Sequence, residues 1–482
     1  IRSYSVGDLV EDPSGGYVKF MVVKGQTGSS KDGAYVHFMK LDRKLNIKSE
    51  KEEYLIGEGS ANALPIGVYN TKDALNIITA MPGKATGTID LKSWEFDIPS
   101  LSLRKGNGDL TSVDINGSKE YDFNTLQLKN GGFVMTMLEE GSKKQNSVLH
   151  CLWFDGTLKL TNKQTQALPY FSNKGQIIKT LTGADNEVYC LLSYPDEKDE
   201  EVLVNSLLVF ANGKNQLVPL NYKDGTLVNC AIGLSKNGLL LSGLIWPGKK
   251  DYSTGLLLAK VSNDGKLEAI REESFATSLL DQLSEADTKK GVKLEYYVRS
   301  VSERTNGVVD VVMNYCSQGG GWTGFYSRTP VRSTTLYDAV IFSFENGRLA
   351  STLSLKRNIE QNTQYGGYVV MPNTFGIPEV FTQGDALYLM YFDNPGNLIG
   401  SNDGKKPKWV DFSKGTLMLA RIDKNFKPTQ QELIQFDKDG EFRSFYELRT
   451  NQLRDKQFIL STNKYAVFSK NVKTASILVD IN

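Results

Sequence analysis

The chain has 482 residues, of which 40% are hydrophobic and 23% are charged, and these shares are typical of a folded globular protein rather than a disordered one. Its 56 Lys and Arg residues nearly balance its 55 Asp and Glu residues. The net charge of +1 excludes nucleic acid as the main partner, because binding to phosphate backbones requires a basic excess or stripe. No apolar run is long enough to predict a transmembrane helix.

A sequence motif of two strands joined by a tight turn is repeated along the chain. Each copy has an apolar strand, then Asp or Asn with Gly or a similar turn residue, then Leu and an alternating strand. A Gly or Asn at the turn supplies the positive φ that a tight hairpin requires. The copies lie at residues 35–45, 148–158, 206–213, 256–267, 340–349 and 417–426.

A further apolar strand, often opened by Gly or Asn, lies upstream of each copy. With one more strand before it and the alternating strand after the turn, each unit has four strands. We therefore expect about eight units of roughly 60 residues (482 divided by eight), each longer than common repeats of about 40–50 residues. Their expected starts lie near residues 1, 60, 117, 170, 221, 290, 365 and 441.

This pattern of repeated four-stranded units resembles the broad β-propeller superfamily. It matches no named blade family, since it lacks regular Trp-Asp endings, kelch Gly-Gly doublets and a sialidase box. The resemblance implies an all-β fold and a single domain over residues 1–482, with eight blades, or seven as the alternative. Residues 1–6 are expected to complete the last blade, which lacks a fourth strand. Tandem β-sandwiches compete with this interpretation, but they would not repeat one phrase six times.

The longest connections fall in the second half of the chain. We expect a helical insertion near 276–291 and long loops at 317–337 and 393–414. In a propeller these connections emerge on one face, and loops of more than about 12–15 residues are usually functional or disordered. This face is therefore the predicted functional surface.

The two long loops are rich in aromatic and cationic side chains, which is the composition of protein-interface anchors. They predict a non-catalytic propeller that binds another protein, as a scaffold or accessory subunit of a cell-envelope or secreted assembly. Packing of the aromatic side chains against the scaffold is the simpler alternative. The predicted partner-binding residues are Trp322, Phe325, Tyr326, Arg328, Arg332, Lys405, Lys408 and Trp409.

The sequence disfavours several kinds of catalysis. His37 and His150 each precede a turn Asp by five residues, so they occupy equivalent strand positions that face the core, which argues against a Ser-His-Asp triad or a zinc site. Asp310 is a lone carboxylate in an apolar strand, whereas glycoside hydrolysis needs two. We expect no cofactor and no metal. The alternative function is a carbohydrate-active enzyme or glycan-binding propeller that uses the central funnel.

Cysteine usage and the first residues bear on the compartment. Four cysteines are widely spaced without a CxxC motif, so they are expected to be small buried side chains, although one pairing stays open. The chain starts without Met or an apolar leader, so either a leader was removed, which would suggest export, or the sequence is trimmed. The expected location is outside the bacterial cytoplasm: periplasmic, outer-membrane-associated or secreted. The four residues are Cys151, Cys190, Cys230 and Cys316.

Overall fold

The structure is a computed structural model that is almost entirely β-strand in the part of the chain it describes. Within that part, α1 (Thr277–Leu280) is the one α-helix, and no helix is long and apolar enough to cross a membrane. The described residues are 3–4, 10–23, 35–55, 64–70, 74–83, 85, 87–115, 121–141, 145–171, 174–196, 203–211, 213–223, 225–248, 251–262, 265–322, 330–363, 378–400, 407–408, 410–411, 415–435, 448–454, 457–465 and 472–480.

Antiparallel strands that are consecutive in sequence pair into sheets. Three sheets have four strands in simple meander order. They comprise β6 (Leu64–Asn70), β7 (Ala74–Pro82), β8 (Thr88–Asp97) and β9 (Leu103–Asp114); β10 (Tyr121–Gln127), β11 (Phe133–Glu139), β12 (Val148–Phe154) and β13 (Leu160–Ala167); and β31 (Glu379–Gln383), β32 (Ala386–Asp393), β34 (Thr416–Ile422) and β35 (Pro428–Gln435).

The two ends of the chain form smaller variations on this plan. The first sheet has five strands and the last has three. The strands are β1 (Ser3–Tyr4), β2 (Val10–Glu11), β3 (Tyr17–Val23), β4 (Tyr35–Leu41) and β5 (Ile47–Tyr54) at the start, and β36 (Leu448–Arg454), β37 (Gln457–Tyr465) and β38 (Val472–Asp480) at the end.

A nine-stranded sheet lies between these ends. It arises because a single bridge, Val204 to Val228, joins a unit of four strands to a unit of four strands that carries the short β18. It is followed by a six-stranded sheet and a small three-stranded one. The nine strands are β14 (Gln176–Thr182), β15 (Val188–Pro195), β16 (Leu203–Ala211), β17 (Lys214–Pro219), β18 (Asn221–Tyr222), β19 (Gly225–Ser235), β20 (Gly238–Trp246), β22 (Gly255–Val261) and β23 (Leu267–Ser274); the six are β26 (Tyr296–Glu303), β27 (Val309–Trp322), β28 (Pro330–Glu345), β29 (Arg348–Leu355), β30 (Ile359–Thr363) and β33 (Val410–Asp411); the three are β21 (Tyr252–Ser253), β24 (Ala286–Asp287) and β25 (Gly291–Lys293).

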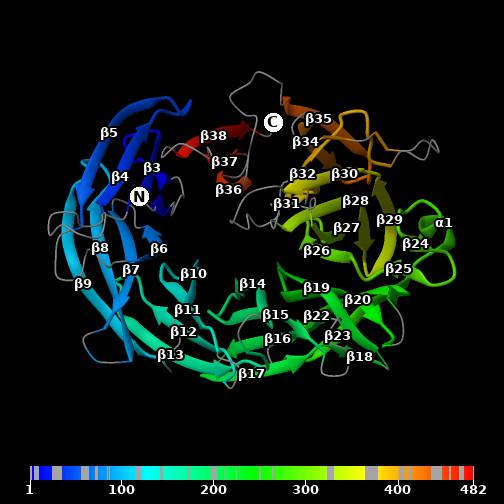
Figure 1. The fold of residues 1–482 in the computed structure, drawn as a ribbon, viewed down its shortest axis with the longest axis horizontal. Coiled ribbons are helices and arrows are strands. Elements are labelled where there is room, and N and C mark those ends of the chain that lie inside the picture. Colours follow the sequence, from blue (N-terminus) through cyan, green and yellow to red (C-terminus); the bar gives the residue numbers. More distant parts are fainter. Residues whose placement is uncertain are drawn as a thin grey trace.

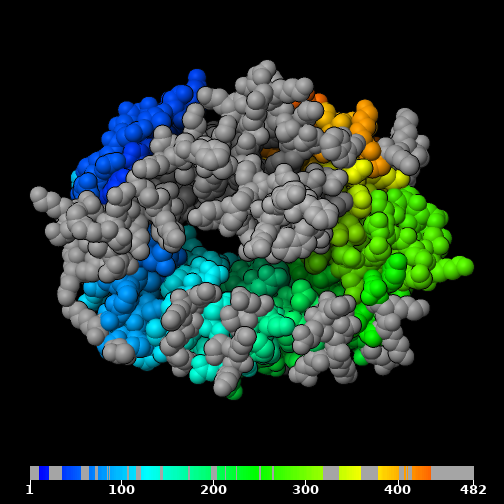
Figure 2. All heavy atoms as spheres, viewed as in Figure 1, coloured from blue at the N-terminus to red at the C-terminus, as the bar shows by residue number. Residues whose placement is uncertain are grey.

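The sheets surround a common centre (Figure 1). The first strand of each unit, such as β10, β14 or β26, lies nearest the centre, and the fourth, such as β13 or β29, lies at the rim. The fold is therefore a β-propeller. Figure 2 shows the same face with the described side chains packed side by side around the ring. The sheets hold between three and nine strands, so their pairing alone does not fix the number of blades.

The expected closure by the N-terminal segment is wrong. β1 pairs with β3 of its own sheet, with Ser3 opposite Val23, rather than with the last sheet. Pairing within one sheet closes a short loop and so costs less conformational entropy than pairing with the far end of the chain.

Burial explains why the middle strands are apolar throughout. Every residue of β11 and of β32 is buried, because each face of a middle strand packs on a neighbouring sheet. The rim strand β13 instead contains only exposed and half-buried residues. One core cluster, for example, combines Ile78 and Leu91 with Met135 and Leu152 from the next sheet. The space between neighbouring sheets is thus the hydrophobic core.

The repeated Asp turns are built by the Asp side chain. Asp155 Oδ1 accepts hydrogen bonds from the backbone N–H groups of Thr157 and Lys159, at 2.8 and 3.0 Å. The residue with positive φ is Leu158, at 67°, and not Gly156 as the sequence suggested. At 346–347, by contrast, both turn residues have positive φ as expected. A carboxylate that fixes the loop can hold even Leu in this conformation.

The expected long loop at 317–337 is mostly strand. β27 and β28 continue their pairing outward, with Ser317 opposite Thr335 and Trp322 opposite Pro330. β30 then pairs with the outer part of β28, and β33 pairs in parallel with β30. We call this extension, made of the outer parts of β27 and β28 with β30 and β33, the insertion sheet. The insertion sheet links two units, because β33 lies in the connection between β32 and β34 and pairs with β30, which follows β29.

Candidate functional site

The predicted partner-binding residues lie on or next to the insertion sheet where the structure describes them. Trp322 is in β27 and Arg332 in β28, opposite Gly320. Lys408 is exposed, and its backbone is held by the side chain of Asn397 at 2.8 and 3.0 Å. The others, Phe325, Tyr326, Arg328, Lys405 and Trp409, lie outside the described residues. The grouping of these eight side chains stays a prediction.

The innermost strands contain a repeated β-bulge that the sequence does not reveal. The register against the next strand skips Ile66 in β6, Ile178 in β14 and Arg299 in β26. A bulge leaves a residue unpaired and redirects its side chain, which is why bulges often occur beside functional sites. The register also shifts in β19 and at Leu453 of β36. Among the positions skipped in β6, β14 and β26, two carry Ile, whereas β26 presents a cation.

Contacts on two sides position Arg299. Its guanidinium carbon lies 4.8 Å from the centroid of the Tyr297 ring, a cation–π distance. Its Nε donates a 2.6 Å hydrogen bond to Oδ1 of Asn314, which is itself fully buried. The Arg299 side chain is only half-buried, and burial lowers its pKa while Cys316 and Tyr297 raise it. The result is a preorganised cation that still reaches solvent.

A second arginine continues this cluster into the junction with the next unit. Cys316 is half-buried, and its thiol pKa is raised by burial and lowered by both Arg299 and Arg357. Arg357 has no exposed surface. Burial lowers its pKa, and the neighbouring Asp393, Tyr391 and Asp338 raise it. A half-buried guanidinium group and a fully buried one therefore act on one thiol, and the carboxylates of Asp338 and Asp393 act on the buried one. We call Tyr297, Arg299, Asn314, Cys316, Arg357, Asp338 and Asp393 the inner-edge cluster.

Asp393 fixes the connection that follows β32. It has no exposed surface, and burial raises its pKa to about 7 although Arg357 and hydrogen bonds lower it. Its Oδ1 accepts hydrogen bonds from the Asn394 backbone at 2.7 Å and from Asn397 Nδ2 at 2.9 Å. Because Asn397 also holds Lys408, the carboxylate organises both ends of this connection.

Two charged side chains of units that are not neighbours also affect each other electrostatically. Lys179 lies on β14 beside its bulge, and Glu379 begins β31. The side chain of Lys179 reaches solvent, yet surrounding protein lowers its pKa while the charge of Glu379 raises it. These strands belong to units that are not neighbours, so the interaction indicates that both side chains extend toward the central space.

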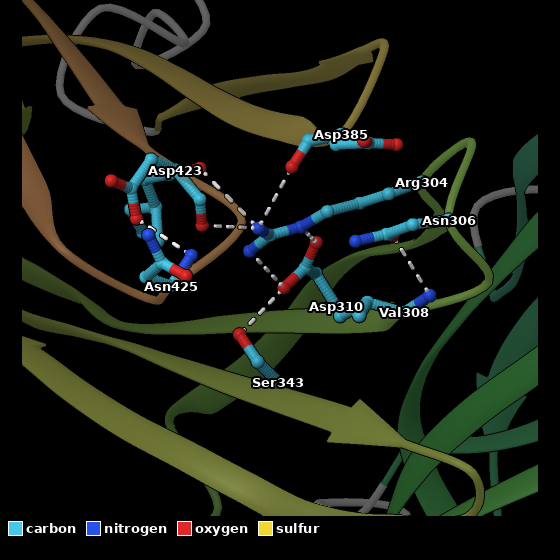
Figure 3. A network of polar contacts seen from close by, with 9 residues as sticks. Arg304, Asn306, Val308, Asp310, Ser343, Asp385, Asp423 and Asn425 are labelled. Carbon is cyan, nitrogen blue, oxygen red and sulfur yellow. Dashed lines mark hydrogen bonds and ion pairs between the residues drawn. The ribbon is translucent and has the colours of Figure 1, made fainter.

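Asp310, the unusual strand carboxylate, has a structural role. It pairs with Arg304 through two hydrogen bonds of 2.6 and 2.9 Å and accepts a third from Ser343 (Figure 3). Arg304 reaches the β31–β35 unit by donating to the carbonyl oxygens of Asp423, at 2.7 Å, and Asp385, at 3.3 Å. Both Arg304 and Asp310 have no exposed surface. The pair joins two units and is closed to substrate.

The remaining sequence candidates also lie in the core or its edge. His150 is buried and lies 3.5 Å from Glu139, whereas His37 is half-buried between Glu50 and Glu52. All four cysteines are free, and Cys316 alone among them is half-buried. Among the described residues, no group of three His, Cys, Asp or Glu could hold a metal ion.

No protein-family model matches the chain, and no curated protein matches its sequence. Solved structures do resemble it. The polysaccharide lyase Uly1 aligns over 99% of this chain and 90% of its own, with a TM-score of 0.45 and 9% identity. An ulvan lyase from a new polysaccharide lyase family aligns over 87% of this chain and 93% of its own, with a TM-score of 0.39 and 10% identity. The β-propeller domain of the trilobed protease from Pyrococcus furiosus aligns over 89% of this chain and 99% of its own, with a TM-score of 0.34 and 8% identity. The likeness is one of fold.

These neighbours run against one prediction. The sequence favoured a non-catalytic scaffold that binds another protein, but two of the three similar structures above are polysaccharide lyases. We therefore discard the scaffold prediction. The surface composition on which it rested is common to many loops and does not specify a protein partner. At these identities no residue role passes from the neighbours to this chain.

Proposed function

We propose that the protein is carbohydrate-active and binds an acidic saccharide at the inner-edge cluster. The observation that carries this proposal is Arg299, which the β26 bulge presents beside Tyr297 and which Asn314 holds at 2.6 Å. A guanidinium fork matches the geometry of a carboxylate or sulfate group. The neighbouring phenol offers an apolar ring with a polar tip, which suits a sugar ring and its hydroxyls.

The buried members of the cluster support Arg299 rather than react. Asp338 and Asp393 have no exposed surface, so in this arrangement they do not reach a sugar. Arg357 and Asn314 are equally buried. Because these side chains are fully packed, they hold Arg299 in the position and orientation that recognition of a ligand requires. Lys179, whose pKa the charge of Glu379 raises, adds a second cation at the central space.

We also propose that the ring has eight blades. The innermost strands of the described sheets after the first begin at residues 64, 121, 176, 225, 296, 379 and 448. These positions lie 4 to 14 residues after the expected unit starts, and the first sheet precedes them. This division treats the nine-stranded sheet as two blades joined by one bridge.

Binding to acidic polysaccharides tests the function. Wild type is expected to bind polygalacturonate, alginate or heparin in affinity electrophoresis and to ignore neutral dextran. Arg299→Ala is expected to weaken binding by about 10- to 100-fold, since a hydrogen-bonded charge contributes roughly 1.5–3 kcal/mol. Arg299→Lys keeps the positive charge but lacks the forked guanidinium group, so its affinity should lie between those of wild type and Arg299→Ala. Release of an unsaturated uronate from the bound polymer would add an eliminative activity.

The matched control is Arg271→Ala, an exposed rim arginine on β23 that pairs with Glu273 at 3.0 Å. It removes the same charge from the whole molecule but leaves the centre intact, so its affinity should equal that of wild type. Equal loss in both variants would point to general charge attraction and against the proposed site. Thermal unfolding of each variant separates lost binding from lost folding.

A further inference from the structure

A cavity of about 330 Å³ lies at the rim of the ring. One wall is the end of β23 and α1, another is β29, and Gly400 of the β32–β34 connection completes it (α1 and β29 lie side by side in Figure 1). The lining residues are Glu273, Ser274, Ala276, Ser278, Leu279, Gln282, Phe342, Leu349, Thr352, Leu353, Ser354 and Gly400.

The size of the cavity fits a small ligand. Small-molecule sites usually have about 300–1,000 Å³ and combine apolar walls with a few placed polar groups. Here Leu279, Phe342 and Leu353 form the apolar part, and the first two are almost completely buried. A cavity of this volume accommodates one or two sugar residues rather than a long polymer.

The polar lining selects the charge of the ligand. It consists of serine and threonine hydroxyls, the carboxylate of Glu273 and the amide of Gln282, and none of the lining residues is cationic. An anion would meet the carboxylate of Glu273 there, whose partner Arg271 does not line the cavity. A neutral ligand with many hydroxyls finds both donors and acceptors.

Two of these polar groups are held in place by the protein. Glu273 accepts a 3.0 Å hydrogen bond from Nε of Arg271, and Gln282 donates a 2.8 Å hydrogen bond to the carbonyl oxygen of Ser278. Groups fixed in this way lose little conformational entropy when a ligand binds. We infer that this rim cavity is a second saccharide site, which takes a neutral sugar residue. The inference does not depend on the inner-edge site.

Ligand-detected NMR with defined monosaccharides tests this site. The probes are glucose, galactose, mannose, xylose and N-acetylglucosamine, with glucuronate as the charged comparison. We expect saturation transfer to at least one neutral sugar and none to glucuronate. Thr352→Trp fills the cavity and should abolish the signal, and Glu273→Gln should weaken binding by about tenfold through loss of a charged hydrogen bond.

The control is Glu272→Gln, the adjacent residue, whose carboxylate instead accepts a hydrogen bond from Tyr222 at 3.2 Å and contacts Lys223. It should leave the neutral-sugar signal unchanged. The inference is overturned if no neutral sugar gives a signal, if Thr352→Trp retains it, or if glucuronate binds equally well. Arg299→Ala must keep this signal, which separates failure here from failure of the inner-edge site.

Discussion

Arg304→Met is expected to lower the free energy of unfolding by about 3–5 kcal/mol, because it leaves Asp310 as an unpaired charge with no exposed surface. The variant also removes the donors to the carbonyl oxygens of Asp423 and Asp385, which weakens the contact between two units. Urea unfolding followed by tryptophan fluorescence measures the change.

The double variant Arg304→Met with Asp310→Leu provides the comparison. It removes the whole ion pair, so it should recover a large part of the loss, since an apolar pair of similar volume can replace a buried ion pair at little cost. Arg271→Ala breaks an exposed pair and should change stability by about 1 kcal/mol or less. A loss below about 1 kcal/mol in Arg304→Met would show that the Arg304–Asp310 pair does not hold the two units together.

Asp393→Asn is expected to make stability depend less on pH. Burial raises the folded-state pKa of Asp393 to about 7, against an ordinary value of 3.8. Between these values the folded protein binds more protons at this site than the unfolded chain, so the contribution of Asp393 is present at low pH and is lost as the pH rises toward 7. Asparagine does not ionise and has no such loss.

The expected size follows from these two pKa values. Between pH 5 and pH 8 the unfolding free energy of Asp393→Asn should rise by about 2–3 kcal/mol relative to wild type. Urea unfolding at both values measures it. Asp281→Asn replaces an exposed carboxylate and should track wild type at both. If the unfolding free energies of Asp393→Asn and wild type differed by the same amount at both pH values, the raised pKa of Asp393 would be contradicted. The groups around this carboxylate are Arg357, Tyr391 and Asn397.

Local chemistry made most strands predictable. The apolar run before Asp155 and the turn after it specify β12 and the start of β13, because the Asp side chain satisfies the turn's own backbone. The same reasoning failed at 317–337. Its Gly and Ser residues indicated a loop, but their backbones pair across a hairpin, as Gly319 does with Ser333. Pairing of this kind depends on the partner strand and leaves no apolar pattern.

The candidate site was less accessible from sequence. Arg299 was missed because its position in a bulge depends on the register between β26 and β27, which no local motif encodes. Asp310 was noticed as an unusual strand carboxylate, but its partner Arg304 lies across a turn that the pattern did not mark as special. The repeated bulges at Ile66 and Ile178 are the signal that would have shown Arg299, once the units were aligned strand by strand.

The bridge between Val204 and Val228 has a consequence for folding. Around it, Asn205 Oδ1 accepts the N–H of Cys230 at 3.0 Å, while its Nδ2 donates to the Leu192 carbonyl oxygen, also at 3.0 Å. Repeat proteins gain cooperativity from such nearest-neighbour terms, and regions that share them open together. Amide hydrogens of β15 and β20 should therefore exchange with deuterium at a common slow rate, as one cooperative block within an otherwise modular ring.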